Sequence, residues 1–328
     1  MKTVDNIIQN PMVSVVIPSY NRANTVSQTI ESILNQKCNF DFELIIGDDC
    51  STDNTRDILS AYQSRYPEQI KLLFYDENIG LGANWATCIK HCRGKYIANC
   101  DNDDYWHHPQ KLQLQVDFME QHLNYGLCYT NYRVHDRTTG RITECEHKHI
   151  IEKESEEEET LLQSVMNGHF TCCNASIMYR KSVLLRYVNM DDFIKYRFSM
   201  QDWNTWALLA PFTEFGFLPV STSTFGVETS SITRPKSIKA LEERWRGHKI
   251  CYKYVCEQFP TDCPYNEKEF DTQVNTICLN FAYETFDFFY AKKYALRCNK
   301  SLKARFANYR ISFYLIAFAG KLKRVCFS

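Results

Sequence analysis

The sequence is poor in the residues and patterns that mark non-globular proteins. Glycine and proline number only 11 and 9 among 328 residues, which excludes collagen-like, low-complexity and disordered classes. The longest apolar stretch, residues 311–319, is far shorter than the ~20 residues that a membrane-spanning helix needs. Residues 1–12 contain no apolar segment of the kind found in a signal peptide. We therefore expect a globular protein that is soluble or lies on a surface.

Neither sign of charge dominates, since 38 basic residues oppose 39 acidic ones for a net charge of -1. This balance argues against a dedicated nucleic-acid-binding protein. The 15 cysteines are odd in number and form no C-x-x-C pair, so they do not indicate a disulfide framework. They predict free thiols in a reducing cytoplasm. No histidine and cysteine grouping has zinc spacing, and no G-x-S-x-G nucleophile motif is present.

The first 130 residues alternate short apolar runs with helical patterns. The runs at 13–17, 42–46, 71–75 and 96–98 predict strands, and each is followed by apolar residues at helical spacing. Such alternation predicts an α/β fold, with a mostly parallel, Rossmann-like sheet that is flanked by helices. A chain of this length can form one large domain or two small ones.

Ligands of open α/β sheets bind beyond the carboxyl ends of the strands, where this chain carries acidic residues. Asp101 and Asp103 follow the run at 96–98, and alternate strand residues point to the same side, so we expect their carboxylates to share a face. Two carboxylates suit Mg²⁺ or Mn²⁺, which complete their coordination with water and substrate phosphates. The alternative is turn and capping chemistry ahead of the helix near 109–112.

Asp48 and Asp49 follow a second apolar run in the same way. A carboxylate there can accept a hydrogen bond from a base N–H or a ribose hydroxyl. The alternative is that Asp49, Ser51 or Asp53 caps the next helix. Tyr20, which follows the first run, could stack on a nucleobase or belong to the core.

Two further segments allow both a functional and a structural interpretation. Residues 78–82 contain a G-x-G pattern, but Trp85 occupies the third glycine position of a dinucleotide fingerprint, so we exclude a Rossmann dehydrogenase. Asp202 begins an amphipathic helical pattern, where an N-cap is the structural alternative to a functional acid.

The last third of the chain has a different composition. From residue 236 onward it is helical and aromatic, and after Asp287 it contains basic but no acidic residues. With Phe306 and Phe313 interleaved, this region predicts either peripheral contact with an anionic membrane face or a helical cap or self-association surface. Residues 144–159 are acid-rich and predict a solvated loop or helix start.

The order and spacing of these segments resemble the family-2 glycosyltransferases of the GT-A fold. The resemblance is carried by Val15-Val-Ile-Pro-Ser-Tyr-Asn21, Ile46-Gly-Asp-Asp-Cys-Ser-Thr-Asp53, Asn78-Ile-Gly80 with Asn84, Asp101-Asn-Asp-Asp-Tyr-Trp106, Pro109-Gln-Lys-Leu112 and Gln201-Asp-Trp203. It implies a GT-A catalytic domain over residues 11–235, with a nucleotide-binding half at about 11–130 and an acceptor half at about 131–235. A helical C-terminal region would occupy 236–328.

Carried over residue by residue, the resemblance implies an inverting, metal-dependent glycosyltransferase. Its donor would be a nucleotide-diphosphate sugar, with a UDP-sugar expected, and its acceptor a hydroxyl group of a glycan or lipid-linked oligosaccharide. Asp202 would be the catalytic base, and Asp103 the principal ligand of Mn²⁺ or Mg²⁺. Asp101 would face the metal or the ribose. The nucleotide pocket would be lined by Pro18, Tyr20, Arg22 and Asp48. Of these, Asp48 would meet the base and Arg22 the diphosphate.

One segment departs from the family pattern. Where many relatives carry Tyr-Arg-x-His before a serine, this chain has Phe225-Gly-Val-Glu-Thr-Ser-Ser231, so Gly226 and Glu228 replace the Arg and the His. Glu228 is the candidate substitute for the missing diphosphate or metal contact. Two alternative functions stay open. One is a sugar-phosphate nucleotidyltransferase, which residues 19–22 disfavour because they lack glycine, and the other is a non-catalytic GT-A scaffold.

Overall fold

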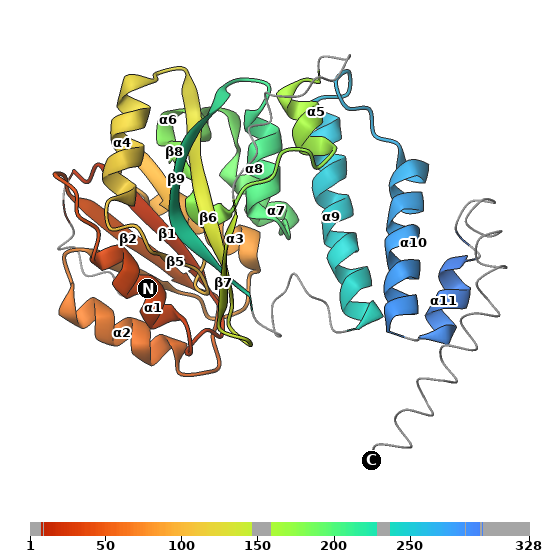
Figure 1. The fold of residues 1–328 in the computed structure, drawn as a ribbon, viewed down its shortest axis with the longest axis horizontal. Coiled ribbons are helices and arrows are strands. Elements are labelled where there is room, and N and C mark those ends of the chain that lie inside the picture. Colours follow the sequence, from red (N-terminus) through yellow and green to blue (C-terminus); the bar gives the residue numbers. More distant parts are fainter. Residues whose placement is uncertain are drawn as a thin grey trace. The chain divides into compact units, whose positions relative to one another are not determined.

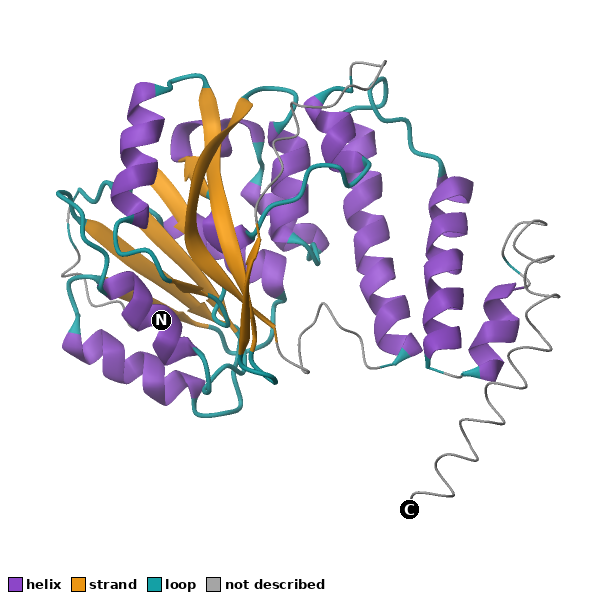
Figure 2. Cartoon of the chain, in the orientation of Figure 1, coloured by secondary structure: helices purple, strands orange, loops and turns teal. Residues whose placement is uncertain are grey.

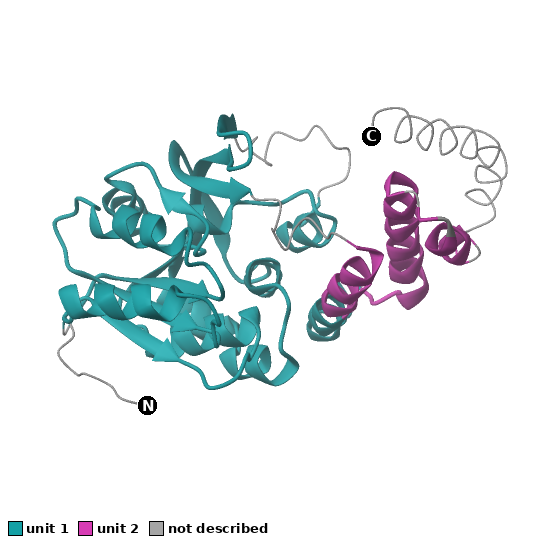
Figure 3. Cartoon of the chain, turned by 90° about the horizontal axis from the view of Figure 1, so that it is seen from below, with its two compact units in different colours: residues 1–231, 250–263 teal, residues 232–249, 264–328 magenta. Residues whose placement is uncertain are grey.

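The chain forms two compact units. In the computed structural model the described residues are 8, 10–145, 159–227, 237–285, 287–295 and 297 (Figure 1). One unit comprises residues 1–231 and 250–263, and the other comprises residues 232–249 and 264–328 (Figure 3). Helix α9 (Ile238–Gln258) contributes to both. The first unit contains the sheet and the second is helical (Figure 2).

Four parallel strands form the N-terminal half of the sheet, in the order β3-β2-β1-β4. Their bounds are β1 (Val13–Ser19), β2 (Phe42–Asp48), β3 (Ile70–Phe74) and β4 (Tyr96–Asn99). The helices between them are α1 (Val26–Leu34), α2 (Thr55–Arg65) and α3 (Leu81–His91). The predicted strand–helix alternation is therefore confirmed.

Strands β1 and β2 are buried along their whole length because helices cover both faces of the sheet. On one face, Val15 and Leu44 share a core with residues of α1 and α2. On the other face, α3 approaches β2 at Gly47, where an added Cβ would lie 1.9 Å from Asn84 Oδ1. Asn84 Nδ2 also donates to the Gly47 carbonyl at 2.8 Å. This asparagine thus fixes α3 to the strand that ends in Asp48.

The second half of the sheet is mixed, and its order continues from β4 as β8-β6-β9-β5, with β7 paired to β6. Only β6 and β9 run parallel to each other among these new pairings. The strands are β5 (Tyr105–Trp106), β6 (Tyr125–Asp136), β7 (Arg141–Cys145), β8 (Met178–Arg180) and β9 (Glu214–Val227). The helical segments are α4 (Lys111–Gln121), α5 (Leu161–Met166), η2 (Asn174–Ser176), α6 (Lys181–Tyr187), α7 (Met190–Tyr196) and α8 (Gln201–Leu209). The predicted α/β fold class is confirmed.

The prediction that the acid-rich residues 144–159 form a solvated loop or helix start is wrong for the first of them, Glu144. Glu144 lies in strand β7, and its Oε1 accepts a hydrogen bond from Arg133 Nε of β6 at 2.5 Å. An ion pair across two strands accounts for an acid in this exposed hairpin. Residues 146–158 lie outside the described residues.

The second unit is built from the first part of α9 together with α10 (Glu267–Glu284) and α11 (Phe288–Ala295). Leu241, Leu279 and Tyr294 bring one residue from each helix to a common apolar core. Glu242 accepts hydrogen bonds from Lys293 Nζ at 2.6 Å and from the Tyr294 hydroxyl, so an ion pair joins α9 to α11. The predicted C-terminal helices are present.

The basic aromatic segment predicted to contact a membrane, including Phe306 and Phe313, lies outside the described residues. Of the helices in the described part, none has both the length and the apolar character to cross a membrane. The cysteines of that part are free thiols, as predicted, and most of them are buried.

Lys111, the first residue of α4, is fully buried. Its Nζ donates to Gln115 Oε1 at 2.5 Å and lies 4.4 Å from the centroid of the Trp106 ring. Burial lowers the pKa of Lys111 from 10.5 to about 8. The native state therefore binds fewer protons than the unfolded chain between these two pH values, so raising the pH through this range favours folding.

Replacing this lysine should remove that pH dependence. We expect the free energy of unfolding of the wild type, minus that of Lys111→Met, to rise by about 3 kcal/mol between pH 8 and 10.5. Urea denaturation of both proteins under reducing conditions measures this difference. Lys37→Met changes an exposed lysine and is the control, which should show no such rise. A difference that stays constant over this range would contradict the buried amine.

Candidate active site

The polar segments that follow β1, β2 and β4 meet at one edge of the sheet. Ser19 at the end of β1 pairs in register with Asp48 at the end of β2. The Asp49 N–H donates to the Ser19 carbonyl at 2.8 Å, and Asn102 Nδ2 donates to Ser19 Oγ at 3.0 Å. Residues 19–22, 48–53 and 101–104 therefore form one continuous polar edge, as the sequence predicts for a ligand site.

Asp101–Asp104 is a turn and not a continuation of the strand, so the predicted strand alternation is wrong here. Strand β4 ends at Asn99, and the Asp104 N–H donates to the Asp101 carbonyl at 2.9 Å. The hydroxyl of Thr25, just before α1, donates to the Asn102 carbonyl at 2.7 Å. The hydroxyl of Thr29, on α1, donates to the Asp104 carbonyl at 2.6 Å. We call residues 101–104 the acid turn. Its closure, rather than the pleat of a strand, brings the carboxylates together.

A chain of buried neutral side chains fixes Asp101. Asn174 Nδ2 donates to both carboxylate oxygens of Asp101, at 3.2 and 3.1 Å. Asn99 Nδ2 donates to Asn174 Oδ1 at 2.9 Å, and Trp85 Nε1 donates to Asn99 Oδ1 at 3.2 Å. Sequence reasoning missed Asn174, because it lies in η2, far along the chain, and no local pattern marks it.

The charge around Asp101 is strongly negative. Burial raises the pKa of Asp101, and the carboxylates of Asp103 and Asp202 raise it further, while the Asn174 amide and Arg22 act in the opposite direction. Asp202, in the first turn of α8, is thus one of the charges that act on Asp101. Asp101 and Asp103 lie together in the acid turn, and Asp202 belongs to a helix about a hundred residues further along the chain.

Asp202 is not the N-cap of α8. The N-cap position is occupied by Met200, and Asp202 lies in the first turn of the helix. Its Oδ1 accepts a hydrogen bond from the Trp203 N–H at 2.7 Å, which satisfies one of the free N–H groups at the helix start. Its side chain is only partly buried. The N-cap position is therefore wrong for Asp202, although its side chain does accept a hydrogen bond from the helix start.

Asp104 is a third acid of the turn, and its buried position could not be predicted. Its side chain is buried, and Oδ1 accepts a hydrogen bond from the Gly226 N–H of β9 at 2.8 Å. Burial raises the pKa of Asp104, as do the charges of Asp103 and Asp101. A Cβ on Gly226 would lie 2.1 Å from the Asp103 carbonyl oxygen, so β9 approaches the acid turn too closely for any side chain. Glu228, the predicted substitute, lies outside the described residues.

Asp48 and Asp49 have different surroundings. The side chain of Asp48 has no exposed surface; its Oδ1 accepts from Arg56 Nε at 2.5 Å and from the Ser51 N–H at 3.1 Å. Within the described residues, Asp48 Oδ2 is buried without a hydrogen-bond partner. Oδ2 is therefore a buried acceptor that the described residues leave unsatisfied.

Asp49 holds the loop before α3 and does not cap α2, whose N-cap is Asn54. Its two oxygens accept the N–H groups of Ile79 at 2.6 Å and Gly80 at 2.9 Å, and burial raises the pKa of Asp49. Gly80 has φ of 90°, a conformation that favours glycine, which explains the G-x-G pattern without a dinucleotide. Asp53 Oδ1 accepts from the Thr55 N–H at 3.0 Å at the start of α2.

The remaining predicted residues lie along the same edge. The Tyr20 side chain is 44% exposed, so the core alternative is wrong for it. Pro18 is buried in β1. It lies beyond Val16, the last residue of β1 that pairs with β4, so its missing N–H removes no hydrogen bond between these two strands. Arg22 Nε contacts Asp103 Oδ2 at 3.3 Å, which puts its guanidinium at the acid turn.

The structural role of Asp49 can be tested by substitution. Asp49→Ala leaves the N–H groups of Ile79 and Gly80 without their acceptor, and we expect it to lower the free energy of unfolding by about 2–4 kcal/mol. Amide exchange at both positions should accelerate. Glu77→Ala, an exposed residue of the same loop, is the control, with an expected change within about 0.5 kcal/mol. Equal stability of the two variants would contradict this role.

Comparison with known proteins identifies the family of this chain. The family model described as "Glycosyl transferase family 2" matches residues 14–188. The putative glycosyltransferase EpsE of Bacillus subtilis is 40% identical over 126 residues, which are 38% of this chain and 45% of that protein. The Escherichia coli UDP-Glc:alpha-D-GlcNAc-diphosphoundecaprenol beta-1,3-glucosyltransferase WfgD is 37% identical over 124 residues, which are 38% of this chain and 46% of that protein. The chain spans less than half the length of these relatives.

Among solved structures, residues 1–349 of S. aureus TarS in complex with UDP-GlcNAc have a similar fold. The TM-score is 0.57 at 18% identity, and the similarity covers 92% of this chain and 80% of that one. At this identity the likeness extends to the fold alone. The family match is the stronger finding, because it spans more than half of the residues and includes β1, β2, β4 and the acid turn. The chain therefore belongs to glycosyltransferase family 2.

Proposed function

We propose that this glycosyltransferase moves a sugar from a UDP-sugar to a hydroxyl group of a glycan or lipid-linked acceptor, with inversion at the anomeric carbon. The observation that carries the proposal is the polar edge at which the ends of β1 and β2 meet the acid turn. This edge gathers acids that suit a metal and its diphosphate. Asp202, a partly buried acid in the first turn of α8, is our candidate for the base that accepts the proton of the acceptor hydroxyl.

The names of the relatives support the choice of substrates. WfgD is named for UDP-Glc as donor and for an acceptor attached to diphosphoundecaprenol, and TarS has been solved with UDP and with UDP-GlcNAc. These properties belong to those proteins. We infer that this chain uses the same class of donor, and that its product enters a surface polysaccharide or related glycan.

The donor atoms of the acid turn fit Mn²⁺ or Mg²⁺. In the part of the chain that the structure describes, no group of three or more His, Cys, Asp and Glu residues could hold a metal ion. Asp101 and Asp103 offer two carboxylates, which suits ions that bind through one or two acids and take further ligands from water and phosphate. When bound, the metal would stabilise the negative charge on the departing diphosphate.

Each proposed residue has a distinct task. Asp202 accepts the proton of the acceptor hydroxyl while that oxygen attacks the anomeric carbon on the face opposite the nucleotide. Tyr20 is exposed and can stack on the base, and Asp48 Oδ2, which is buried without a partner among the described residues, is the candidate acceptor for a base N–H. Pro18 shapes the strand end beneath the base. Arg22 lies within reach of a phosphate held at the acid turn, because it already contacts Asp103.

The base assignment predicts a separation of binding from turnover. Asp202→Asn should bind UDP with Mn²⁺ as the wild type does, but its acceptor-dependent UDP release should fall by about 10²–10⁴-fold, since the amide cannot accept the proton. A lipid-linked GlcNAc diphosphate serves as the acceptor. Asp191→Asn, which changes an exposed acid on α7, is the matched control and should keep full turnover. Near-normal turnover of Asp202→Asn would remove this residue from the role.

The donor and metal assignments are tested together by thermal shift. A panel of UDP-, GDP- and dTDP-sugars, each with and without Mn²⁺, should give its largest stabilisation with a UDP-sugar and Mn²⁺, because ligands that bind only the native state stabilise it. Asp103→Ala should abolish the Mn²⁺-dependent part. Unchanged UDP affinity in that variant would contradict the metal site.

The products separate the alternative functions. Release of pyrophosphate would indicate nucleotidyl transfer. UDP binding without turnover on any acceptor would favour a non-catalytic scaffold.

A further inference from the structure

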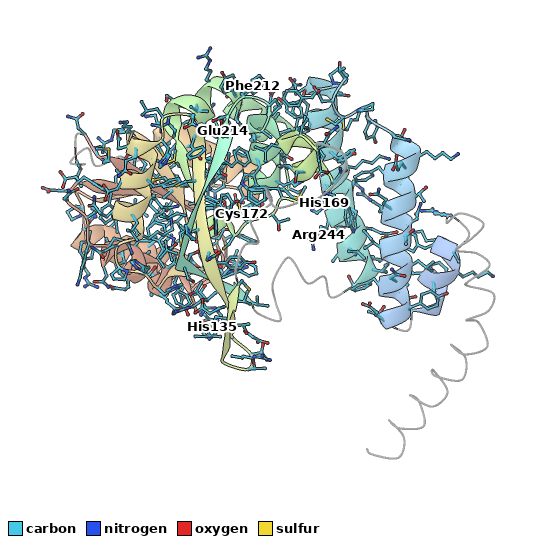
Figure 4. All side chains as sticks on the ribbon, turned by 45° about the horizontal axis from the view of Figure 1, so that its top comes forward. His135, His169, Cys172, Phe212, Glu214 and Arg244 are labelled. Atoms are coloured by element: carbon cyan, nitrogen blue, oxygen red, sulfur yellow. The ribbon has the colours of Figure 1, made fainter. Side chains whose placement is uncertain are left out.

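The hairpin of β6 and β7 reaches the acid turn from the far half of the sheet. Strand β6 runs beside β9 to its end, with His135 opposite Gly226 and Asp136 opposite Val227. His135, labelled in Figure 4, lies near the end of this hairpin. The Arg137 N–H donates to the Val227 carbonyl at 3.0 Å, so the pairing continues one residue beyond the strand. Arg137 is thereby fixed next to the glycine that contacts the acid turn.

The Arg137 side chain crosses this glycine to bind the acid turn. Its Nη2 donates to the Asp103 carbonyl oxygen at 2.8 Å. A Cβ on Gly226 would lie 2.1 Å from that same oxygen and 2.9 Å from Arg137 Nε. Because Gly226 has no side chain, the guanidinium of Arg137 has room to contact the turn at this position. A larger residue there would displace the turn, the arginine or both.

The guanidinium also offsets charge at the turn. Its positive charge opposes the burial and repulsion that raise the pKa of Asp104. Its central carbon lies 5.9 Å from the centroid of the Tyr105 ring, which directly follows the turn. Arg137 thus contacts the turn through a main-chain carbonyl, a neighbouring charge and an aromatic ring.

The two arginines at the turn differ in the atoms that they use. Arg22 contacts a carboxylate oxygen of Asp103, so it competes with any cation for that atom. Arg137 uses the main-chain carbonyl of the same residue, so it leaves both carboxylate oxygens for a ligand. It can therefore orient Asp103 both before and after a metal and diphosphate bind.

We propose that Arg137 is a positioning residue for donor binding, and that it supplies, from the position directly after β6, the positive charge that the loop at Gly226 lacks. The proposal rests on the proposed function only in taking the acid turn as the place where a metal and nucleotide diphosphate bind. Arg137 does not act on the reacting atoms. It holds the Asp103 backbone so that the carboxylate faces the ligand.

The test uses UDP with Mn²⁺ as the probe and the full chain as the protein. Arg137→Gln should weaken the Mn²⁺-dependent UDP affinity, measured by calorimetry, by about 10–100-fold, as is typical when a group that orients a metal ligand is removed. Arg137→Lys keeps the charge and should recover part of the loss. Arg133→Gln is the matched control: it removes an arginine from the same strand that pairs with exposed Glu144, and it should leave the affinity unchanged.

A double-mutant cycle tests the contact with glycine. Gly226→Ala sets a methyl group against both the Asp103 carbonyl and Arg137 Nε, so it should weaken UDP binding at least as much as Arg137→Gln does. Because the Arg137 contact is already lost in Gly226→Ala, adding Arg137→Gln to it should change the affinity by no more than about twofold. Additive losses would show that the two residues act separately and would overturn the proposal.

Amide exchange gives a readout that needs no ligand. The Asp104 N–H closes the acid turn, and its exchange should accelerate in Arg137→Gln but not in Arg133→Gln. If Arg137→Gln leaves both UDP affinity and exchange at wild-type values, the proposal is overturned, and the proposed function stands if Asp103→Ala still abolishes binding. If the wild type binds no UDP with Mn²⁺, the donor assignment fails, and exchange alone decides the role of Arg137.

Discussion

Repulsion between carboxylates gathered on one short turn is the constraint that the surrounding structure must meet. Asp101, Asp103 and Asp104 lie within four residues. Burial raises the pKa values of Asp101 and Asp104, and the Asp103 carboxylate raises both further. Like charges at this spacing disfavour the ionised state, so the turn needs partners from its surroundings. Neutral donors come from separate segments: two threonines before and on α1, Asn174 and Gly226. Two arginines add positive charge, Arg22 at a carboxylate oxygen of Asp103 and Arg137 at its main-chain carbonyl.

The two sides of the site depend on different parts of the fold. The nucleotide side is formed by neighbouring parallel strands, and α3 is anchored to one of them by the Asn84 contact at Gly47. The opposite side comes from η2, α8 and β9, which approach the acid turn only because β4, β8, β6 and β9 lie side by side in the sheet. The parallel half therefore presents the residues that we propose to bind the nucleotide, while the mixed half carries Asp202 and Asn174. In the proposed function, this division would allow a donor and an acceptor to be held against one another.

Local sequence patterns were sufficient for the parallel half and for the edge at which the candidate residues lie, and insufficient for their contacts. The apolar runs predict β1 to β4 because both faces of these strands are buried, and acids after such runs must lie at one edge. The same patterns could not separate Asp48 from Asp49, since both follow β2, and only long-range packing directs Asp49 to the N–H groups of Ile79 and Gly80. They also predicted the wrong local geometry for the acid turn, because a short polar sequence of this kind is compatible with both a strand end and a turn. Asn174 has no local signal at all, because its role depends on contacts 73 residues away.

Gly226 illustrates why a departure from a family motif need not remove the property that the motif provides. A missing arginine is a loss if the acid turn needs a side chain from that position. Here the backbone of β9 lies so close to the turn that no side chain fits, and a guanidinium from the adjacent strand occupies the space that the glycine leaves. The physical requirement is a positive charge and a hydrogen-bond donor near the acids, and either strand can meet it. The substitution at residue 226 is therefore weak support for a non-catalytic scaffold, since a scaffold with no ligand to bind would not need three acids and an arginine held in contact at one edge of the sheet.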